Sequence, residues 1–375
     1  MLQIDHVYEF FYENLFKDFQ TIFLPNGFLP TNITGDILDD MHVFNEDKIN
    51  KIFFYDQEPV LPNFIDPYLD FGKFRTNIDI LATSEKSLLI DTICKNNNAQ
   101  SLYYFFHGFA ALDWYRGHYA LNYNKVIVRQ YNHDFISFNR IINNDRSYRI
   151  YFVSLLKEQG LLEKGLVSFN VTDNLFDDWR DEVSSDNSKL SKNAKQHIEY
   201  NLIDINKLVI DSPELPGSAS ADIPRDQDAF WHVVTETVFY YDKLHLTEKI
   251  FKPIVSKQPF MLLAAPGNLA YLKSYGFKTF ESVIDETYDT IQDNDSRIEA
   301  VVDQLRWYCN LSPEEKTDII RRLEPIIQHN FDHFYGEFRH IITRELLDNT
   351  KSLLQSIDYN DSCIDYDSLY IVLTK

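Results

Sequence analysis

Short apolar runs alternate with longer polar stretches through the first third of the chain. Each run is too short for a helix and is closed by turn residues such as Pro25-Asn26-Gly27, which is typical of β-strands. A helix is expected between the last two runs, from Ser84 to Asn96. The predicted strands cover Gln20–Phe28, Lys51–Tyr55, Ile78–Ala82 and Ser101–Phe106. Largely apolar strands separated by helices predict a parallel sheet with both faces covered.

The same alternation resumes in the second half of the chain. A strand, a charged bend and another strand are predicted within Lys125–Arg140, and we place the crossing between two domains there. The next elements expected are strands at 136–138, 166–169, 230–239 and 258–263, and helices at 146–158, 296–310, 312–330 and 332–357. The polar stretch Asp173–Asp222 is interpreted as a solvated insertion, and the apolar LYIVL near the C-terminus as a final strand. The fold expected is therefore α/β with two domains, at 1–132 and 133–345, followed by a tail at 346–375.

Composition narrows the class of protein. Apolar residues make up 44% of the 375 residues, which is ample for large cores. The net charge of −21 disfavours non-specific binding to nucleic acid. Three widely spaced cysteines form no metal-ligand pattern, the N-terminus lacks a basic signal-peptide region, and no apolar run approaches the ~20 residues of a membrane span. A cytoplasmic protein is expected, and nothing in the sequence indicates its oligomeric state.

The stretch Trp231–Phe280 contains the largest concentration of candidate functional side chains. Between two apolar runs it places the polar side chains Glu236, His245, Thr247, Glu248 and Lys249. If Thr247 caps a helix running to Ser256, the backbone N–H groups of the first turn and the lysine charge would suit a pyrophosphate at the carboxyl end of a sheet. The alternative is an ordinary capped helix with a charged first turn, kinked at Pro253.

This stretch resembles the donor-binding motif of the fucosyltransferase-like glycosyltransferases. The likeness rests on an acidic residue followed by a gap and then HLTEK, an apolar helix and a strand, and it extends to glycosyltransferase-like proteins of phages and bacteria. It covers about residues 230–285, with a weaker likeness at 133–168. The resemblance implies a GT-B architecture, in which two Rossmann-like domains face each other across a cleft, and a nucleotide-diphosphate sugar as donor. It further implies that Glu248 holds the ribose, Lys249 the phosphates, and that Glu236 lines the sugar pocket. Lys252-Pro253 departs from the Asn-Ala usual in that helix.

Three arginines follow the strand expected at 136–138. Arg140, Arg146 and Arg149 could hold the departing diphosphate by forked hydrogen bonds, with Arg140 the first choice. For Arg146 and Arg149 the alternative is a surface position on an amphipathic helix. Because no Asp-x-Asp ends a strand, we expect no divalent metal.

A carboxylate follows the strand Lys51–Tyr55. Glu58-Pro59 resembles a Glu-Ser-Pro that supplies the base in fucosyltransferases, so Glu58 is the candidate base of an inverting transfer, with Asp56 as second choice. An acidic turn before a proline explains the same residues without catalysis.

The acceptor is less clearly indicated. His107, Trp114, Arg116 and His118 lie in an aromatic segment that could stack on a sugar or base, although the segment is more typical of a half-buried aromatic cluster. The acceptor expected is a glycan or lipid-linked saccharide, or a hydroxymethylated base of phage DNA if a basic cleft forms around Arg116, Lys125 and Arg129. The alternative function is an inactive GT-B domain that binds a nucleotide or carbohydrate.

Overall fold

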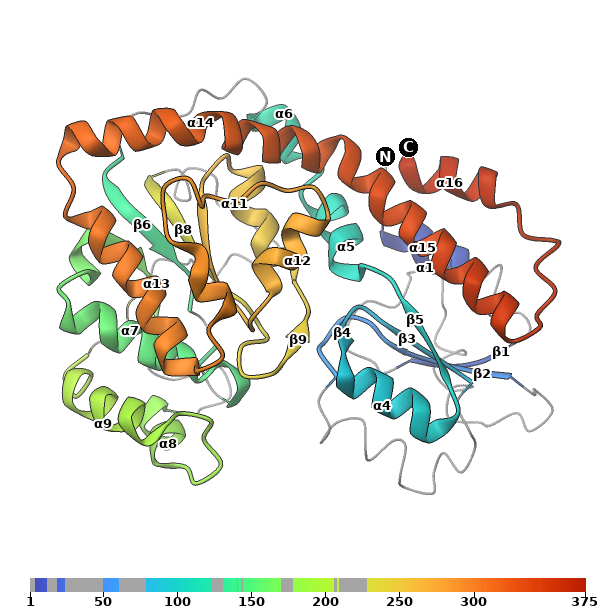
Figure 1. The fold of residues 1–375 in the computed structure, drawn as a ribbon, viewed down its shortest axis with the longest axis horizontal. Helices are drawn as coiled ribbons and strands as arrows, with labels where there is room; N and C mark the ends of the chain where they lie inside the picture. Colours follow the sequence, from blue (N-terminus) through green and yellow to red (C-terminus); the bar gives the residue numbers. More distant parts are fainter. Residues whose placement is uncertain are drawn as a thin grey trace. The chain divides into compact units, whose positions relative to one another are not determined.

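The chain is an α/β protein with parallel sheets (Figure 1). The computed structural model describes residues 4–11, 19–23, 50–60, 79–122, 131–139, 141–142, 144–169, 178–205, 208 and 228–375. Contacts divide the chain into two compact units. Unit 1 comprises Met1–Arg116, Lys243–His245 and Gly336–Lys375, and unit 2 comprises Gly117–Asp242 and Leu246–Tyr335.

Unit 1 contains a four-stranded parallel sheet in which spatial order follows chain order. Its strands are β1 (Phe19–Phe23), β2 (Asn50–Tyr55), β3 (Ile80–Thr83) and β5 (Gln100–Tyr103). All four were predicted, with ends that shift by a few residues. The clearest shift is at β5, which stops at Tyr103 because Phe106 already begins a helix. The predicted continuation of β1 to Phe28 lies outside the described residues.

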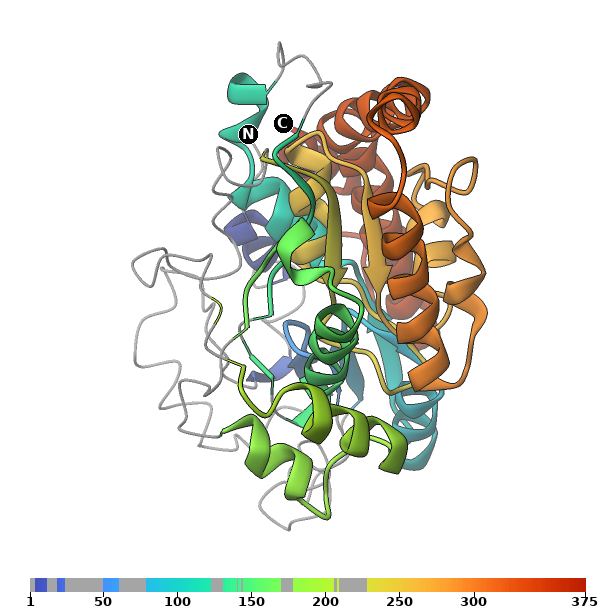
Figure 2. The same cartoon turned by 90° about the vertical axis from the view of Figure 1, so that its left-hand side faces the viewer.

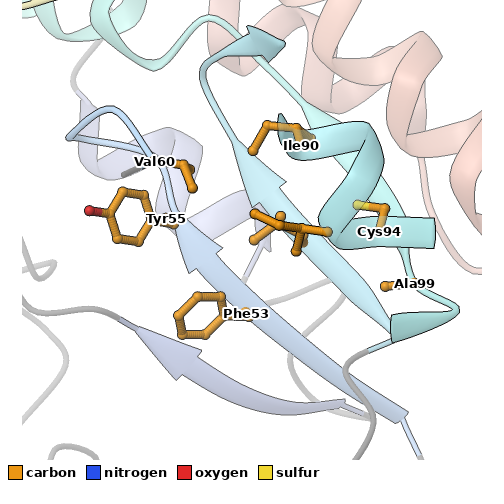
Figure 3. Close-up of a cluster of buried hydrophobic side chains, with 8 residues drawn as sticks. Phe53, Tyr55, Val60, Ile90, Cys94 and Ala99 are labelled. Atoms are coloured by element: carbon orange, nitrogen blue, oxygen red, sulfur yellow. The ribbon is translucent and has the colours of Figure 1, made fainter. Parts of the chain in front are cut away.

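Helices cover both faces of this sheet, and alternate side chains of β2 divide between them. Phe53 and Tyr55 lie in an apolar cluster with Ile90 and Cys94 of α4 (Leu88–Asn97), as Figure 3 shows. Phe54 points the other way, where its ring lies 5.3 Å from that of Phe11. The other helices of this unit are α1 (Ile4–Phe11), α5 (Phe106–Trp114), α15 (Glu337–Ser356) and α16 (Tyr366–Thr374). α1 contacts α5 and α16, and α15 contacts α5, α16 and β5.

A short antiparallel ladder adds a distant piece of chain to unit 1. β4 (Lys86–Ser87) pairs with β9 (Lys243–Leu244). Beside it the Lys243 ammonium lies 2.9 Å from the Glu85 carboxylate, and both side chains are buried. Part of the loop that follows Glu236 is thereby fixed in unit 1.

Unit 2 contains a second parallel sheet, and its strand order reverses. The strands are β6 (His133–Ser137), β7 (Gly165–Val167), β8 (Ala229–Thr235) and β10 (Phe260–Leu263), in the spatial order β10-β8-β6-β7. The chain moves outward from β6 to β7 on one side and from β8 to β10 on the other. The reversal therefore lies between β6 and β8, the position at which open α/β sheets bind ligands.

The helices of unit 2 pack around this sheet. α13 contacts α7, β6 and β10, whereas α11 contacts α14 and α6. The α8–α9 hairpin, inside the predicted insertion, lies beside α7 (Figure 2). Their bounds are α6 His118–Asn122, η3 Asn144–Arg146, α7 Tyr148–Glu158, η4 Leu162–Lys164, α8 Trp179–Ser184, α9 Lys192–Asn201, η5 Glu248–Ile250, α11 Phe251–Val255, α12 Asn268–Ser274, η6 Glu286–Thr290, α13 Asn294–Cys309 and α14 Pro313–Tyr335.

Two predictions near the C-terminus are wrong. The LYIVL segment lies in α16, a helix that begins where the Asp365 side chain accepts a hydrogen bond from the backbone of Ser368. The break between the last two long helices lies at Gly336 and not near residue 331, because α14 continues through Pro325 to Tyr335. Among the described residues, no helix combines the length and the apolar character that crossing a bilayer requires.

Candidate functional site

The carboxyl ends of β6 and β8 form the candidate site of unit 2. β6 is followed by Phe138-Asn139 and β8 by Glu236-Thr237. The hydroxyl of Thr235 donates to the Phe138 carbonyl at 3.0 Å, which joins the two strand ends.

Glu236 is the centre of a hydrogen-bond network in this site. Its side chain is completely buried, and its carboxylate accepts from the N–H of Thr237 at 3.2 Å. It also accepts from the N–H of Thr247 at 3.2 Å and from the Thr247 hydroxyl at 2.5 Å. Burial raises the pKa of Glu236, and the charge of Lys249 and the hydrogen bond from Thr247 oppose that rise. The buried carboxylate therefore links the end of β8 to the segment that begins at Thr247.

The segment after Thr247 differs from the regular helix that was predicted. Thr247 does act as the cap, since its hydroxyl accepts from the backbone N–H of Lys249. The chain then forms one 3₁₀ turn, η5, and only five α-helical residues, α11, which include Pro253. Two such short pieces supply little helix dipole. A bound anion would therefore depend on side-chain charge at this position.

Lys249 supplies that charge. Its ammonium lies 3.1 Å from the Glu248 carboxylate and 3.3 Å from the hydroxyls of both Thr237 and Thr247. The Lys249 side chain is 28% exposed, whereas that of Glu248 is 6% exposed. Lys249 is therefore accessible to a ligand, and Glu248 is turned toward Lys249 inside the protein.

Arg149 lies beneath the same strand end. It is buried and donates to the carbonyls of Thr235 at 2.6 Å, Glu236 at 3.3 Å and Ile141 at 2.9 Å. The alternative of a surface position is wrong for this arginine. Its spacing from Val153, one helical turn further on, placed it on the apolar stripe of α7 and could have indicated its burial.

Arg146 and Arg140 are the other two arginines of the predicted clamp. Arg146 ends η3 and is half-buried, so it is not a fully exposed surface residue. Arg140 lies outside the described residues.

The loop after Glu236 is fixed by an aromatic column that the sequence did not indicate. The rings of Tyr148 and Phe239 stack at 4.0 Å with an interplanar angle of 14°. The buried guanidinium of Arg297 lies 4.2 Å from the centre of the Phe239 ring and donates to the Phe239 carbonyl at 2.9 Å. The Tyr148 hydroxyl donates to the Glu236 carbonyl at 2.6 Å. The backbone that presents Glu236 is therefore held from both sides.

In unit 1 the predicted base residues follow β2, as expected, but differ in their surroundings. Asp56 is buried, and its carboxylate accepts from the hydroxyls of Tyr104 and Tyr8, the latter at 3.2 Å. Burial raises the pKa of Asp56 to about 6, against the lowering effect of these hydrogen bonds. Glu58, two residues on, is exposed.

His107 and His245 also lie in unit 1. The Nε2–H of His107 donates to the Gln57 carbonyl at 2.8 Å, since a carbonyl can only accept. The rings of His107 and His245 lie 5.2 Å apart and perpendicular. His245, predicted with the donor-binding residues, is thus fixed in unit 1 by packing against His107.

The four acceptor candidates differ in their surroundings. His107 contributes to the cluster just described, and Trp114 ends α5 half-buried. Arg116 is exposed and forms an ion pair with Asp113. His118 belongs to unit 2, where burial and the charge of Lys252 lower its pKa. Lys125 and Arg129, the other members of the basic cleft considered above, lie outside the described residues.

Within the described ranges, no group of three or more His, Cys, Asp or Glu side chains is arranged to hold a metal ion. Comparisons of the chain with protein-family models, curated proteins and solved structures gave no match.

Proposed function

We propose that this chain is a glycosyltransferase that moves a sugar from a nucleotide-diphosphate sugar to an acceptor hydroxyl. The architecture we propose is GT-B, of the kind found in fucosyltransferase-like enzymes. The observation that carries the proposal is the partly exposed ammonium of Lys249, held where the strand order of the unit 2 sheet reverses. That position is the general ligand-binding edge of doubly wound sheets.

The proposed role of this site is to stabilise the departing diphosphate. Transfer without a metal needs fixed positive charge where negative charge develops. Lys249 offers it through an ammonium whose side chain is 28% exposed, so an anion would bind at its exposed side. Arg149 donates to three carbonyl oxygens, which carry no negative charge, so its charge adds to that of Lys249. Arg140 is proposed as a further contact, and Glu248 as the ribose partner.

The proposed base is Glu58, which would take the proton of the acceptor hydroxyl in an inverting transfer. Its exposure favours it over Asp56, whose carboxylate already accepts from two tyrosines. We propose a glycan as the acceptor. The net charge of −21 and the pairing of Arg116 with Asp113 argue against a duplex, so a hydroxymethylated DNA base is the second choice.

A thermal-shift screen with UDP-, GDP-, CMP- and ADP-sugars tests the donor site. A donor at a hundred times its Kd should stabilise the folded protein by about 2.7 kcal/mol, enough to raise Tm visibly. Lys249→Met should then weaken binding in calorimetry by about tenfold or more, since it removes a charge-assisted contact. Lys273→Met, which removes an exposed lysine paired with Glu281, is the matched control.

The outcomes separate the candidate functions. If no donor raises Tm, or if Lys249→Met binds as tightly as the control variant, the donor-site assignment fails. Binding followed by release of nucleoside diphosphate in the presence of an acceptor supports the transferase. Binding without any turnover supports the inactive binding domain instead.

A further inference from the structure

We propose that Glu236 is a positioning residue, which fixes Lys249 through the hydroxyl of Thr247 and does not itself contact the ligand. The inference rests on the proposed function in that Lys249 is taken as the anion-binding group. Glu236 was expected to line the sugar pocket, and the proposal assigns it instead to holding Lys249 in position.

The contacts form a continuous chain from the strand to the ammonium. The Lys249 ammonium donates to the Thr247 hydroxyl at 3.3 Å, and that hydroxyl donates to Glu236 at 2.5 Å. The backbone N–H of Lys249 also approaches the Thr247 hydroxyl, at 3.4 Å. Thr247 is therefore in contact with both ends of Lys249 and with the carboxylate behind it.

The direction of each hydrogen bond is fixed by proton count. A hydroxyl has one proton, and an ammonium can only donate. Because Lys249 donates to the Thr247 oxygen, the single Thr247 proton is directed to Glu236. Two backbone N–H groups, of Thr237 and Thr247, also point at the carboxylate. Three donors converge on Glu236, so an ionised carboxylate satisfies the network and an amide in its place does not.

The burial of Glu236 indicates that it acts on a ligand through other residues and not by direct contact. Its side chain is completely buried, and its carboxylate accepts from Thr237 and Thr247. Lys249, by contrast, is 28% exposed at the other end of the chain of contacts. A ligand would therefore contact the ammonium, and the Glu236 carboxylate would act on its position through Thr247, beside the direct contacts of Lys249 with Glu248 and Thr237.

Substitutions at Thr247 separate positioning from general stability. Thr247→Val keeps the shape of the side chain but removes the hydroxyl, whereas Thr247→Ser keeps the hydroxyl. We expect the valine variant to weaken nucleoside diphosphate binding by about three- to tenfold and the serine variant to bind like the wild type. Glu236→Gln should resemble the valine variant, because its amide places a donor against one of three donors.

A double-mutant cycle gives the decisive readout, with UDP and GDP as probes in calorimetry. If Thr247 acts through Lys249, Thr247→Val should cost nothing further in a Lys249→Met background, so the two effects are not additive. Additive losses would overturn the proposal, and so would equal binding by the valine variant and the wild type. Thermal melting of each variant accompanies the cycle, since a purely structural role would lower Tm without this non-additivity.

A second measurement works without any nucleotide and keeps the inference distinguishable from the proposed function. Acetic anhydride labels lysines according to their accessibility, and mass spectrometry reports the rate at each position. Relative to Lys273 in the same sample, Lys249 should react several-fold faster in Thr247→Val and Glu236→Gln than in the wild type or Thr247→Ser. If no nucleotide binds the wild type but this pattern is found, the proposed function fails and the positioning role stands. Unchanged Lys249 labelling in both variants would overturn the positioning role.

Discussion

Replacing Asp56 by asparagine should shift the stability of the protein, relative to the wild type, in favour of the variant as pH rises. The carboxylate is buried and accepts hydrogen bonds from the hydroxyls of Tyr8 and Tyr104. Asparagine retains a carbonyl oxygen that can accept from both hydroxyls, but it cannot ionise. Its NH2 group would face the backbone donors of Asp56 and Gln57, a cost that does not change with pH. The substitution therefore removes the cost of a buried charge while it keeps an acceptor in place.

The magnitude follows from the pKa of Asp56, which the fold raises from 3.8 to about 6. Because the folded state binds the proton more tightly than the unfolded chain does, ionisation of Asp56 reduces the free energy of unfolding. The loss of unfolding free energy is small at pH values below the Asp56 pKa of the unfolded chain. It grows as pH rises from about 4 to 6 and is complete above the Asp56 pKa of the folded state. A shift of this size corresponds to about 3 kcal/mol in full, of which about 2 kcal/mol is lost between pH 4 and pH 7.

Urea unfolding followed by circular dichroism between pH 4 and pH 7 measures this effect. The difference between Asp56→Asn and the wild type at each pH cancels the contributions of the other titrating groups. That difference should grow by about 2 kcal/mol in favour of the variant as pH rises. Asp91→Asn, at an exposed carboxylate on α4, is the control for the substitution itself. A difference that stays flat, or that grows toward low pH, would refute the reasoning.

Two further predictions concern other carboxylates of unit 1. Glu58→Gln should abolish sugar transfer while calorimetry shows unchanged donor binding, and loss of transfer in Asp56→Asn with an active Glu58→Gln would assign the base to Asp56. Glu85→Gln should destabilise the protein by about 3–5 kcal/mol in urea unfolding, because it leaves the buried Lys243 ammonium without its counter-charge. Adding Lys243→Met should recover most of that loss, and a double variant no more stable than Glu85→Gln would contradict this account.

Helices and strands were predicted correctly where the local pattern of apolar and polar residues is enough to specify them. Lys51–Tyr55 is a short apolar run before turn residues, and β2 forms over Asn50–Tyr55. LYIVL has the same local character but belongs to α16. Its tertiary contacts explain the difference, since Leu373 is buried and the Tyr370 hydroxyl accepts from Arg344 of α15 and hydrogen-bonds His340 of the same helix. An apolar run alone does not distinguish a strand from a helix that packs one face.

In the candidate site, too, some features follow from local sequence and others from tertiary contacts. The sequence by itself determined the chemistry available near residues 236–249, because residue types and their spacing are local properties. It also identified Thr247 as a cap, since capping depends on the residues directly beside it. The cap formed at the predicted residue, although the helix after it is shorter and begins as a 3₁₀ turn.

Only the tertiary structure decided which partners these groups have. Glu236 lies eleven residues from Thr247, and Arg149 lies 86 residues from Thr235, so neither contact can be derived from local pattern. The same loop sends Lys243 into a buried ion pair with Glu85, 158 residues away. Burial and long-range hydrogen bonds give Glu236 its supporting role and leave Lys249 accessible. The physical reason is that the role of a charged side chain depends on its solvent exposure and its partners, which the packing of distant segments determines.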